Sequence, residues 1–353
     1  MTRLSPRTRS GRGRALVRAS VLASLMALAL PAAVRAHDFP GLPVDGAAAF
    51  DRPFYAGAYL GDDATRTERI ERSIDAYART VGKRPALVKS FHRLDVDFSE
   101  TGWAGQLLRR TSRAGSTPYV ALDLTWGGAP SRNLLDAINS GRADRHLVAA
   151  ARGMAGAGTV LVEPGWEMNG RWGYAWQGVV NGHAEGPAKY RRAFQRIVEI
   201  FRREGAGNVR WVFAPNVGNI VGGGWNHYSH YYPGDRYVDI LGPHGYNSPR
   251  LWGGAWSSFQ TMFDGDRMLT ELETRWPNKP IIIGEFASDE AGGDKGRWIS
   301  DAFATMRRHR NVVGAIWFNM RKEADWRVDS SRSALDAYRA VMRDPNIRTT
   351  FRG

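Results

Sequence analysis

Two glutamates stand at the ends of apolar segments of this sequence, where they could act as acid, base or nucleophile. Glu285 directly follows the apolar run 280–284, and Glu167 follows the run 159–164 after two further residues. A buried carboxylate costs several kcal/mol unless it is paired or hydrogen-bonded. Two carboxylates in one site suit glycoside hydrolysis, where they lie about 5–5.5 Å apart in retaining enzymes. The structural alternatives are a salt bridge for Glu285 and a helix cap for Glu167.

Tryptophans near strand ends and in loops favour a sugar ligand. Flat aromatic faces exposed in a cleft suit the apolar faces of pyranose rings. We expect nine of the 13 tryptophans to face solvent at the catalytic end, and Trp317 is the first choice among them because it ends the last strand. The nine are Trp126, Trp166, Trp172, Trp176, Trp225, Trp252, Trp256, Trp317 and Trp326.

Eight short runs rich in β-branched and aromatic residues predict the strands that position these side chains. They are apolar throughout rather than alternating, as parallel strands buried on both faces are. The runs are 54–59, 86–91, 118–124, 159–164, 209–215, 238–242, 280–286 and 312–318.

Helical patterns separate the predicted strands. Thr65-x-x-Glu68 forms a capping box before an amphipathic segment that ends near Val81, and Pro187 occupies a first-turn position of another. The segment between the fifth and sixth strands is predicted as a loop with a short helix. Further helices are predicted at about 103–113, 131–153, 260–275, 295–309 and 331–342.

This alternation predicts an α/β fold, a single (β/α)8 TIM barrel over residues 37–353. An open doubly wound sheet is the alternative, but no Gly-x-Gly-x-x-Gly follows the first strand. In a barrel the C-terminal strand ends carry the chemistry. Both glutamates would therefore reach the same end of it.

Residues 1–36 have the pattern of a secretory signal peptide. Seven arginines and no acid accompany an apolar run from 19 to 30, and small residues precede a cleavage site after Ala36. The run is short for a bilayer span, which needs about 20 residues. We expect a secreted or periplasmic protein without stable membrane insertion, the alternative being an uncleaved anchor.

Charge and cysteine content exclude several classes of function. Half of the net charge of +14 belongs to the leader, and the other basic residues are scattered over predicted helices. We read them as solvated helix faces, not as a nucleic-acid site. The absence of cysteine excludes thiol catalysis, thiolate zinc sites and disulfides. We expect a monomer that needs no cofactor.

Five segments in order resemble those of glycoside hydrolase family 26, whose barrels carry catalytic glutamates on strands four and seven. Together they span most of the chain after the leader. They are Glu-Met-Asn-Gly-Arg-Trp at 167–172 with Trp176 after it, Trp-Val-Phe-Ala-Pro-Asn at 211–216, Tyr-Pro-Gly-Asp at 232–235 with Tyr-Val-Asp-Ile at 237–240 and Gly245-Tyr246, Gly-Glu-Phe at 284–286, and Trp-Phe-Asn at 317–319.

The resemblance implies a role for each matching residue. Glu167 would be the acid/base and Glu285 the nucleophile, with Tyr246 hydrogen-bonded to Glu285 and holding it ionised. Trp172 and Trp317 would line the subsites on either side of the cleaved bond. The implied substrate-binding residues are Trp166, Asn169, Trp172, Trp176, Asn216, His244, Tyr246 and Trp317.

Two positions depart from the family pattern. Trp166 replaces the histidine that usually precedes the acid/base, which weakens the assignment to mannan more than the mechanism. Glu163-Pro164 replaces Arg-Pro. If the strand continued, Glu163 would lie about 13 Å deeper than Glu167 on the same face. We expect Glu163 to pair with an arginine or lysine such as Lys89.

The sequence thus predicts a secreted, retaining endo-β-glycanase, with β-1,4-mannan as the first substrate. Mixed-linkage β-glucan, β-1,3-xylan and bacterial exopolysaccharide are alternatives. A second class is a non-catalytic glycan-binding or polysaccharide-assembly protein on the same barrel. A third is a metal hydrolase, but its ligands would lie in a loop rich in hydrogen-bonding residues, so no metal is expected. Those ligands would be His227, His230, Asp239 and His244.

Overall fold

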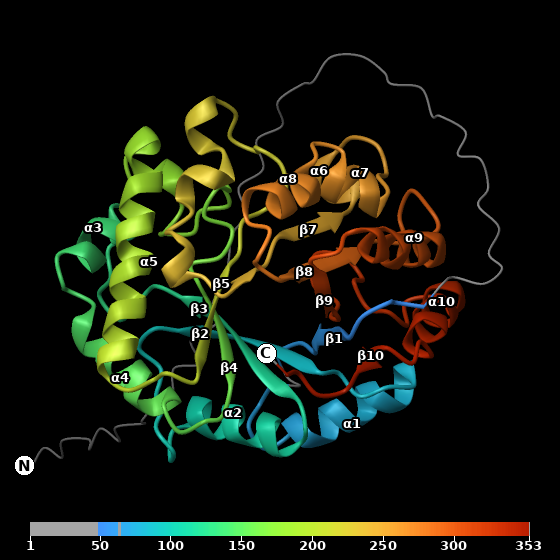
Figure 1. Cartoon of the computed structure of the whole chain (residues 1–353), viewed down its shortest axis with the longest axis horizontal. Coiled ribbons are helices and arrows are strands. Elements are labelled where there is room, and N and C mark those ends of the chain that lie inside the picture. The colour runs from blue at the N-terminus through green and yellow to red at the C-terminus, as the bar shows by residue number, and fades with distance from the viewer. Residues whose placement is uncertain (1–48, 63–64, 353) are drawn as a thin grey trace, which may run out of the picture. The chain divides into compact units, whose positions relative to one another are not determined.

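A computed structural model describes residues 49–62 and 65–352, and its strands form a closed parallel barrel (Figure 1). The predicted leader, 1–36, lies outside the described residues. Strands β1 to β5 pair in chain order, β6 pairs with β5 and β8, and β9 pairs with both β8 and β1. This closure confirms the predicted (β/α)8 barrel and excludes the open sheet. The strands are β1 Phe54–Tyr59, β2 Leu87–Arg93, β3 Thr117–Asp123, β4 Val160–Pro164, β5 Val209–Phe213, β6 Ile240–Leu241, β7 His244–Asn247, β8 Ile281–Ser288 and β9 Val312–Phe318.

Helices surround the barrel at or near the predicted positions. The predicted helices 131–153 and 260–275 are each split into two, and the segment between β5 and β6 holds three short 3-10 turns. The helices are α1 Ile70–Val81, α2 Trp103–Arg113, α3 Leu134–Asn139, α4 Asp144–Met154, α5 Gly186–Arg203, α6 Pro249–Trp252, α7 Phe259–Asp264, α8 Met268–Arg275, α9 Lys295–Arg308 and α10 Arg332–Met342.

Two local predictions are wrong. The first helix begins at Ile70, not beside Thr65, because the Arg69 and Ile70 amides bond to the Arg66 carbonyl and close a turn first. The predicted sixth strand, 238–242, is reduced to β6, and the strand β7, which was not predicted, follows after Gly242 and Pro243. Proline has no N–H to donate to a strand ladder, so the pairing is interrupted there.

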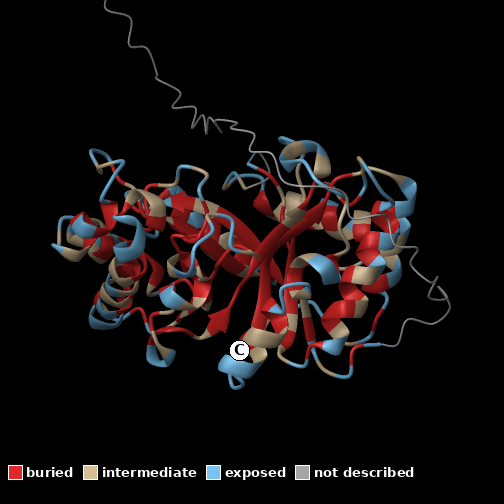
Figure 2. Ribbon diagram, turned by 90° about the horizontal axis from the view of Figure 1, so that it is seen from above, coloured by how far each residue is buried: buried red, intermediate tan, exposed pale blue. Residues whose placement is uncertain are grey.

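The barrel interior is filled by apolar side chains in its lower part. These side chains come from seven strands and form one buried cluster, with Tyr55 and Phe351 packed against it. Figure 2 shows the barrel strands largely buried and most exposed residues on helices and loops, although Arg93 at the end of β2 is exposed. This explains why the strands read as continuous apolar runs. The cluster comprises Ala86, Leu87, Tyr119, Leu161, Val212, Ile240, Ile282 and Ile316.

A short strand at the C-terminus, β10 Ile347–Arg348, pairs in parallel with β1 outside the closed ring. Among the described residues, no helix combines the length and the apolar character that crossing a membrane requires.

Candidate active site

Four ionisable side chains occupy the barrel interior directly above the apolar cluster. They are Lys89 on β2, Glu163 on β4, His244 on β7 and Glu285 on β8, and all four are buried. Side chains alternate along a strand, so Lys89 points inward because Leu87 does, and Glu163 does because Leu161 does. The charged layer is therefore a consequence of strand register.

Ion pairs and hydrogen bonds connect this layer. Lys89 forms an ion pair with Glu163, as predicted, and its Nζ also lies 2.7 Å from Glu285 Oε1. The Tyr119 hydroxyl donates to Glu163 Oε2 at 2.7 Å, and His244 Nε2 lies 3.1 Å from the same oxygen. Each buried carboxylate thus has a cationic neighbour, which offsets the cost of its desolvation.

His244 connects the two glutamates that the sequence singles out. Its Nδ1 lies 3.2 Å from Glu167 Oε1 and 3.8 Å from Glu285 Oε2. Burial and the Lys89 charge lower the pKa of His244, but Glu285 and Glu163 outweigh them and raise it to about 9. The ring is therefore an imidazolium at neutral pH, and both of its N–H groups donate to carboxylates.

Glu167 is held by its backbone in a left-handed conformation, with φ of 51°. Its amide donates to the Ala214 carbonyl at 2.7 Å, and its own carbonyl accepts from Gly170 N at 2.9 Å and from Gln177 Nε2 at 3.1 Å. A non-glycine residue in this region is strained and persists only where its surroundings fix it. These three bonds turn the Glu167 side chain back over the barrel.

The same turn shows that the expected 13 Å separation of Glu163 and Glu167 is wrong. Strand β4 ends at Pro164, and the chain reverses at Gly165 and Glu167, both with positive φ. The two carboxylates consequently contact opposite nitrogens of one imidazole ring.

Glu285 is aimed into the barrel by a β-bulge. Ile283 pairs with Ala315 and Phe286 with Trp317, so two residues of β8 stand opposite Ile316 alone. Strict alternation from the inward-facing Ile282 would turn Glu285 toward the helices. A bulge re-aims a side chain in this way.

Electrostatics keep Glu285 ionised. Burial by itself raises the pKa of Glu285, but the charges of Lys89 and His244 and hydrogen bonds from Lys89 and Tyr246 hold that pKa below its usual range. The Tyr246 hydroxyl donates to Glu285 Oε2, as the resemblance implied. Glu285 therefore has the charge state of a nucleophile.

The proposed histidine metal ligands are not brought together. His227 contacts Ser229 and Glu271, His230 faces the Trp225 carbonyl, and Asp239 accepts from Trp211 N. Within the described residues, the group with metal-ligand geometry is Glu163, His244 and Glu285. The Lys89 ammonium contacts all three and provides positive charge at this place.

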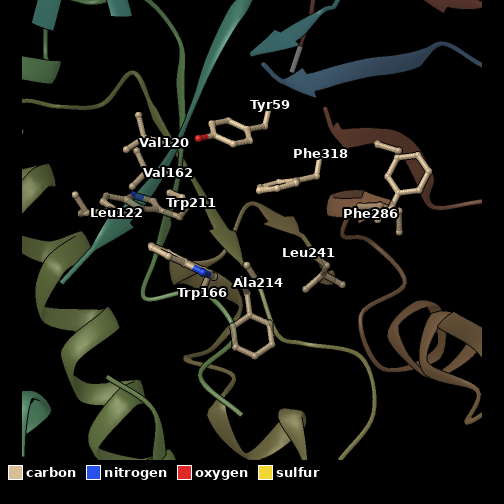
Figure 3. Packing of buried hydrophobic residues seen from close by; sticks show 14 of the residues in the cluster. Tyr59, Val120, Leu122, Val162, Trp166, Trp211, Ala214, Leu241, Phe286 and Phe318 are labelled. Atoms are coloured by element: carbon tan, nitrogen blue, oxygen red, sulfur yellow. The ribbon is translucent and has the colours of Figure 1, made fainter. Parts of the chain in front are cut away.

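Aromatic rings surround the carboxylates. Tyr59 of β1 lies 4.8 Å from Phe318 of β9 and 5.0 Å from Phe91 of β2, between ring centroids. Phe91 in turn meets Trp166 at 5.2 Å, and Phe318 meets Tyr246 at 5.4 Å. Figure 3 shows Tyr59 and Phe318 side by side, with Phe286 apart from them. Aromatic side chains thus border the charged layer.

The expectation that nine tryptophans face solvent is wrong for most of them. Trp317 is 0% exposed and packs behind the barrel against Trp298 and Tyr338. Because adjacent side chains on a strand alternate, Phe318 occupies the inward position that was assigned to Trp317. Trp172, Trp225 and Trp256 are half-buried, and Trp252 is exposed. The other buried ones are Trp126, Trp166, Trp176 and Trp326.

Several predicted substrate-binding residues hold loops instead. The Asn169 side chain is fully buried, accepts from Asn216 N at 2.8 Å and donates to the Asn216 carbonyl at 2.9 Å. Trp176 donates its Nε1 to the Trp166 carbonyl at 2.7 Å. These residues fix the positions of Glu167 and Trp166 and offer no free polar group to a ligand.

The prediction missed residues whose importance depends on contacts between distant segments. Lys89 was expected only as a partner of Glu163. Trp317 was chosen in place of its neighbour Phe318, and no sequence pattern pointed to Gln177. Alternation counted from Ile316 would have found Phe318. Nothing local in the sequence marks Gln177, whose side chain also accepts from Gly173 N and Tyr174 N.

Comparisons with known proteins are consistent with this geometry. A family model described as glycosyl hydrolase family 26 matches residues 154–276, a region that includes Glu167 and ends before Glu285. Endoglucanase H of Acetivibrio thermocellus is 38% identical over 288 residues, which make up 81% of this chain. The chain spans only 30% of the length of that relative.

Solved structures share the fold at low sequence identity. An endo-β-1,4-mannanase from Cellulomonas fimi matches with a TM-score of 0.58 and 20% identity, over 77% of this chain and 66% of that one. A β-mannanase from Bacteroides ovatus matches with a TM-score of 0.61 and 15% identity, over 84% and 90%. A Bacillus subtilis mannanase gives 0.58 and 17%, over 85% and 87%.

Proposed function

We propose that this chain is a member of glycosyl hydrolase family 26 and acts as a retaining, endo-acting hydrolase of a β-linked glycan; the match to the family model and the 38% identity to an endoglucanase support this. The observation that carries the proposal is the pair Glu167 and Glu285, gathered around one nitrogen of His244. Two carboxylates close together fit a double displacement, whereas inverting enzymes need them about 6.5–9.5 Å apart to admit a water.

In the first step, Glu285 attacks the anomeric carbon and Glu167 protonates the departing glycosidic oxygen. Oε1 of Glu167 accepts from His244, which leaves Oε2 to carry the transferred proton. Tyr246 and Lys89 keep Glu285 charged before attack. In the second step, Glu167 removes a proton from water, which attacks the glycosyl-enzyme and releases Glu285.

Lys89, His244 and Glu163 have a defined part in this scheme. Lys89 and His244 stabilise the Glu285 carboxylate, and Glu163 balances their charge. Without Glu163, two buried cations would face one nucleophile and lower its reactivity along with its pKa. We infer that the network gives Glu285 a pKa that is low enough to keep the carboxylate ionised but not so low that the carboxylate loses its nucleophilicity.

β-Glucan is the first substrate to test. The relative that is 38% identical is named an endoglucanase. The expectation of β-1,4-mannan moves to second place, because the structures described as mannanases share at most 20% identity with this chain among those compared. Trp166 also replaces the histidine expected of a mannan-type site, which supports the same order. Export through residues 1–36 remains part of the proposal.

The test is hydrolysis of a polysaccharide panel by the wild type, Glu285→Ala and the control Glu323→Gln. The panel contains β-glucans, β-mannan, glucomannan, β-1,3-xylan and bacterial exopolysaccharides. One polymer should be cut, at least about 10³-fold more slowly by Glu285→Ala. Glu323→Gln alters an exposed carboxylate and should match the wild type.

Azide should rescue Glu285→Ala and yield an α-glycosyl azide, because it attacks from the face that the nucleophile vacates. Hydrolysis by Glu285→Ala at the wild-type rate would contradict the assignment. Binding of a glycan without any cleavage would instead favour the glycan-binding alternative.

A further inference from the structure

Trp252 has the most exposed large apolar side chain among the described residues, at 59%. It ends α6, which follows β7 at the catalytic end of the barrel (Figure 1). A single exposed apolar residue is ordinary and needs no explanation. What distinguishes Trp252 is its arrangement with two other rings.

Three aromatic rings lead from the nucleophile to the surface, and we call Tyr246, Trp326 and Trp252 the aromatic ladder. Tyr246 donates to Glu285, and its ring centroid lies 5.2 Å from that of Trp326. Trp252 lies 6.0 Å from Trp326 with an interplanar angle of 19°, so the two indoles stack nearly parallel. The rings form a continuous apolar path that begins at the reacting carboxylate.

The outer end of the ladder is fixed in place. Arg250 stands two residues before Trp252, and its Nε donates to Asp289 Oδ2 at 3.2 Å. Its Nη2 donates to the Glu323 carbonyl at 2.7 Å. These bonds tie α6 to the end of β8 and to the loop that carries Trp326. A ring that is already ordered loses little conformational entropy when a ligand stacks on it.

We propose that Trp252, the exposed end of the aromatic ladder, binds a pyranose unit on the glycone side of the cleaved bond. The proposal rests on the proposed function, because Glu285 bonds to the anomeric carbon of the glycone. The glycone continues from the opposite end of that sugar ring, away from the leaving group, and we place it toward the ladder. The leaving group lies instead beside Glu167, the acid. The ligand is an uncharged β-linked sugar, whose axial C–H groups pack against an indole face.

The test uses aryl β-glycosides with one to four sugar units and the same aryl leaving group, with the sugar chosen from the polymer panel. Trp252→Ala should leave kcat/KM for the one-unit substrate unchanged. For the longest substrate it should lower kcat/KM about tenfold, mostly through KM. Trp252→Phe keeps a ring and should recover part of the loss.

Trp103→Ala is the matched control. Trp103 is 50% exposed on α2, but its ring contacts His92 and no member of the ladder. It should behave as the wild type at every length. A loss in Trp252→Ala that is equal at all lengths, or no loss at any, would overturn the proposal.

Calorimetric binding of the four-unit oligosaccharide separates this inference from the proposed function. The titration compares Glu285→Ala with the double variant that also carries Trp252→Ala. About tenfold weaker binding in the double variant supports the ladder even if the wild type cleaves nothing. Equal binding contradicts the ladder even if hydrolysis is found.

Discussion

At the residue scale, the site depends on four buried charges that neutralise one another. Lys89 and His244 are cations, Glu163 and Glu285 are anions, and none of them is exposed to more than a small degree. Removing one partner of such a network leaves an unpaired buried charge, which costs more than the pair contributes. The network therefore sets both the stability of the upper barrel and the protonation of the reacting groups.

The protonation of His244 gives a direct test. Glu285 and Glu163 raise its pKa to about 9, whereas burial lowers the pKa of His92 to about 4. In an NMR titration of ring-labelled histidine, one buried ring should titrate near pH 9, and Glu163→Gln should lower that value. His92 is the internal control and should not become charged above pH 5.

The raised pKa of His244 also predicts how stability depends on pH. Its contribution is fully present below its ordinary pKa of about 6.5 and is lost as the pH rises through about 9. The free energy of unfolding should fall by about 3 kcal/mol from this group. A His244 resonance that titrates at or below pH 6.5 would contradict the charged network.

At the element scale, irregular backbone aims the two glutamates that we propose as catalytic. The bulge in β8 turns Glu285 inward, and the turn after β4 turns Glu167 inward with a strained φ. Gly284 within the bulge allows the close approach of β7, because a Cβ there would lie 2.6 Å from His244 Nε2 and 2.9 Å from the Gly242 carbonyl. Only glycine fits this position without displacing His244.

Gly284→Ala should therefore impair catalysis more than folding. The added methyl group displaces His244, and we expect kcat/KM to fall about 100-fold and the free energy of unfolding by about 2 kcal/mol. Steady-state kinetics and urea unfolding measure the two effects. Gly207→Ala is the control, since a Cβ at Gly207 meets nothing within 4 Å. Gly284→Ala with wild-type kinetics would show that the bulge tolerates the methyl group.

At the scale of the whole molecule, the barrel divides stability from chemistry. Its lower interior is apolar and is joined by Tyr55 and Phe351, whose rings lie 4.8 Å apart. Its upper interior holds the charged layer, and the strand ends and loops there carry the aromatic rings. This polarity is general for barrels of this kind, in which the C-terminal strand ends carry function.

The leader completes the molecular picture as a prediction. Residues 1–36 are expected to direct export and to be removed after Ala36. Expression of the full chain in a bacterium should give extracytoplasmic protein that begins at His37, as measured by intact mass. Ala36→Glu should block the cleavage and leave the longer form attached to the membrane. A wild-type protein that keeps residues 1–36 would favour the uncleaved anchor.

The sequence alone determined the barrel and most of its strands, and it singled out the two glutamates that the structure brings to one site. Apolar runs, helix periodicity and the position of an acid at a strand end are local features, and local features can be recognised in a single sequence. Even the pairing of Glu163 with Lys89 follows from the rule that buried charges find partners.

Only the tertiary structure decided where these side chains point. Three features depend on the register between strands. They are the bulge at Gly284 and Glu285, the turn at Glu167, and the inward direction of Phe318 in place of Trp317. A shift of one residue moves a side chain to the opposite face. Register is set by contacts between segments far apart in the sequence, and so the two glutamates and the Lys89 pairing were predictable, whereas the direction of each side chain and the aromatic neighbours of the site were not.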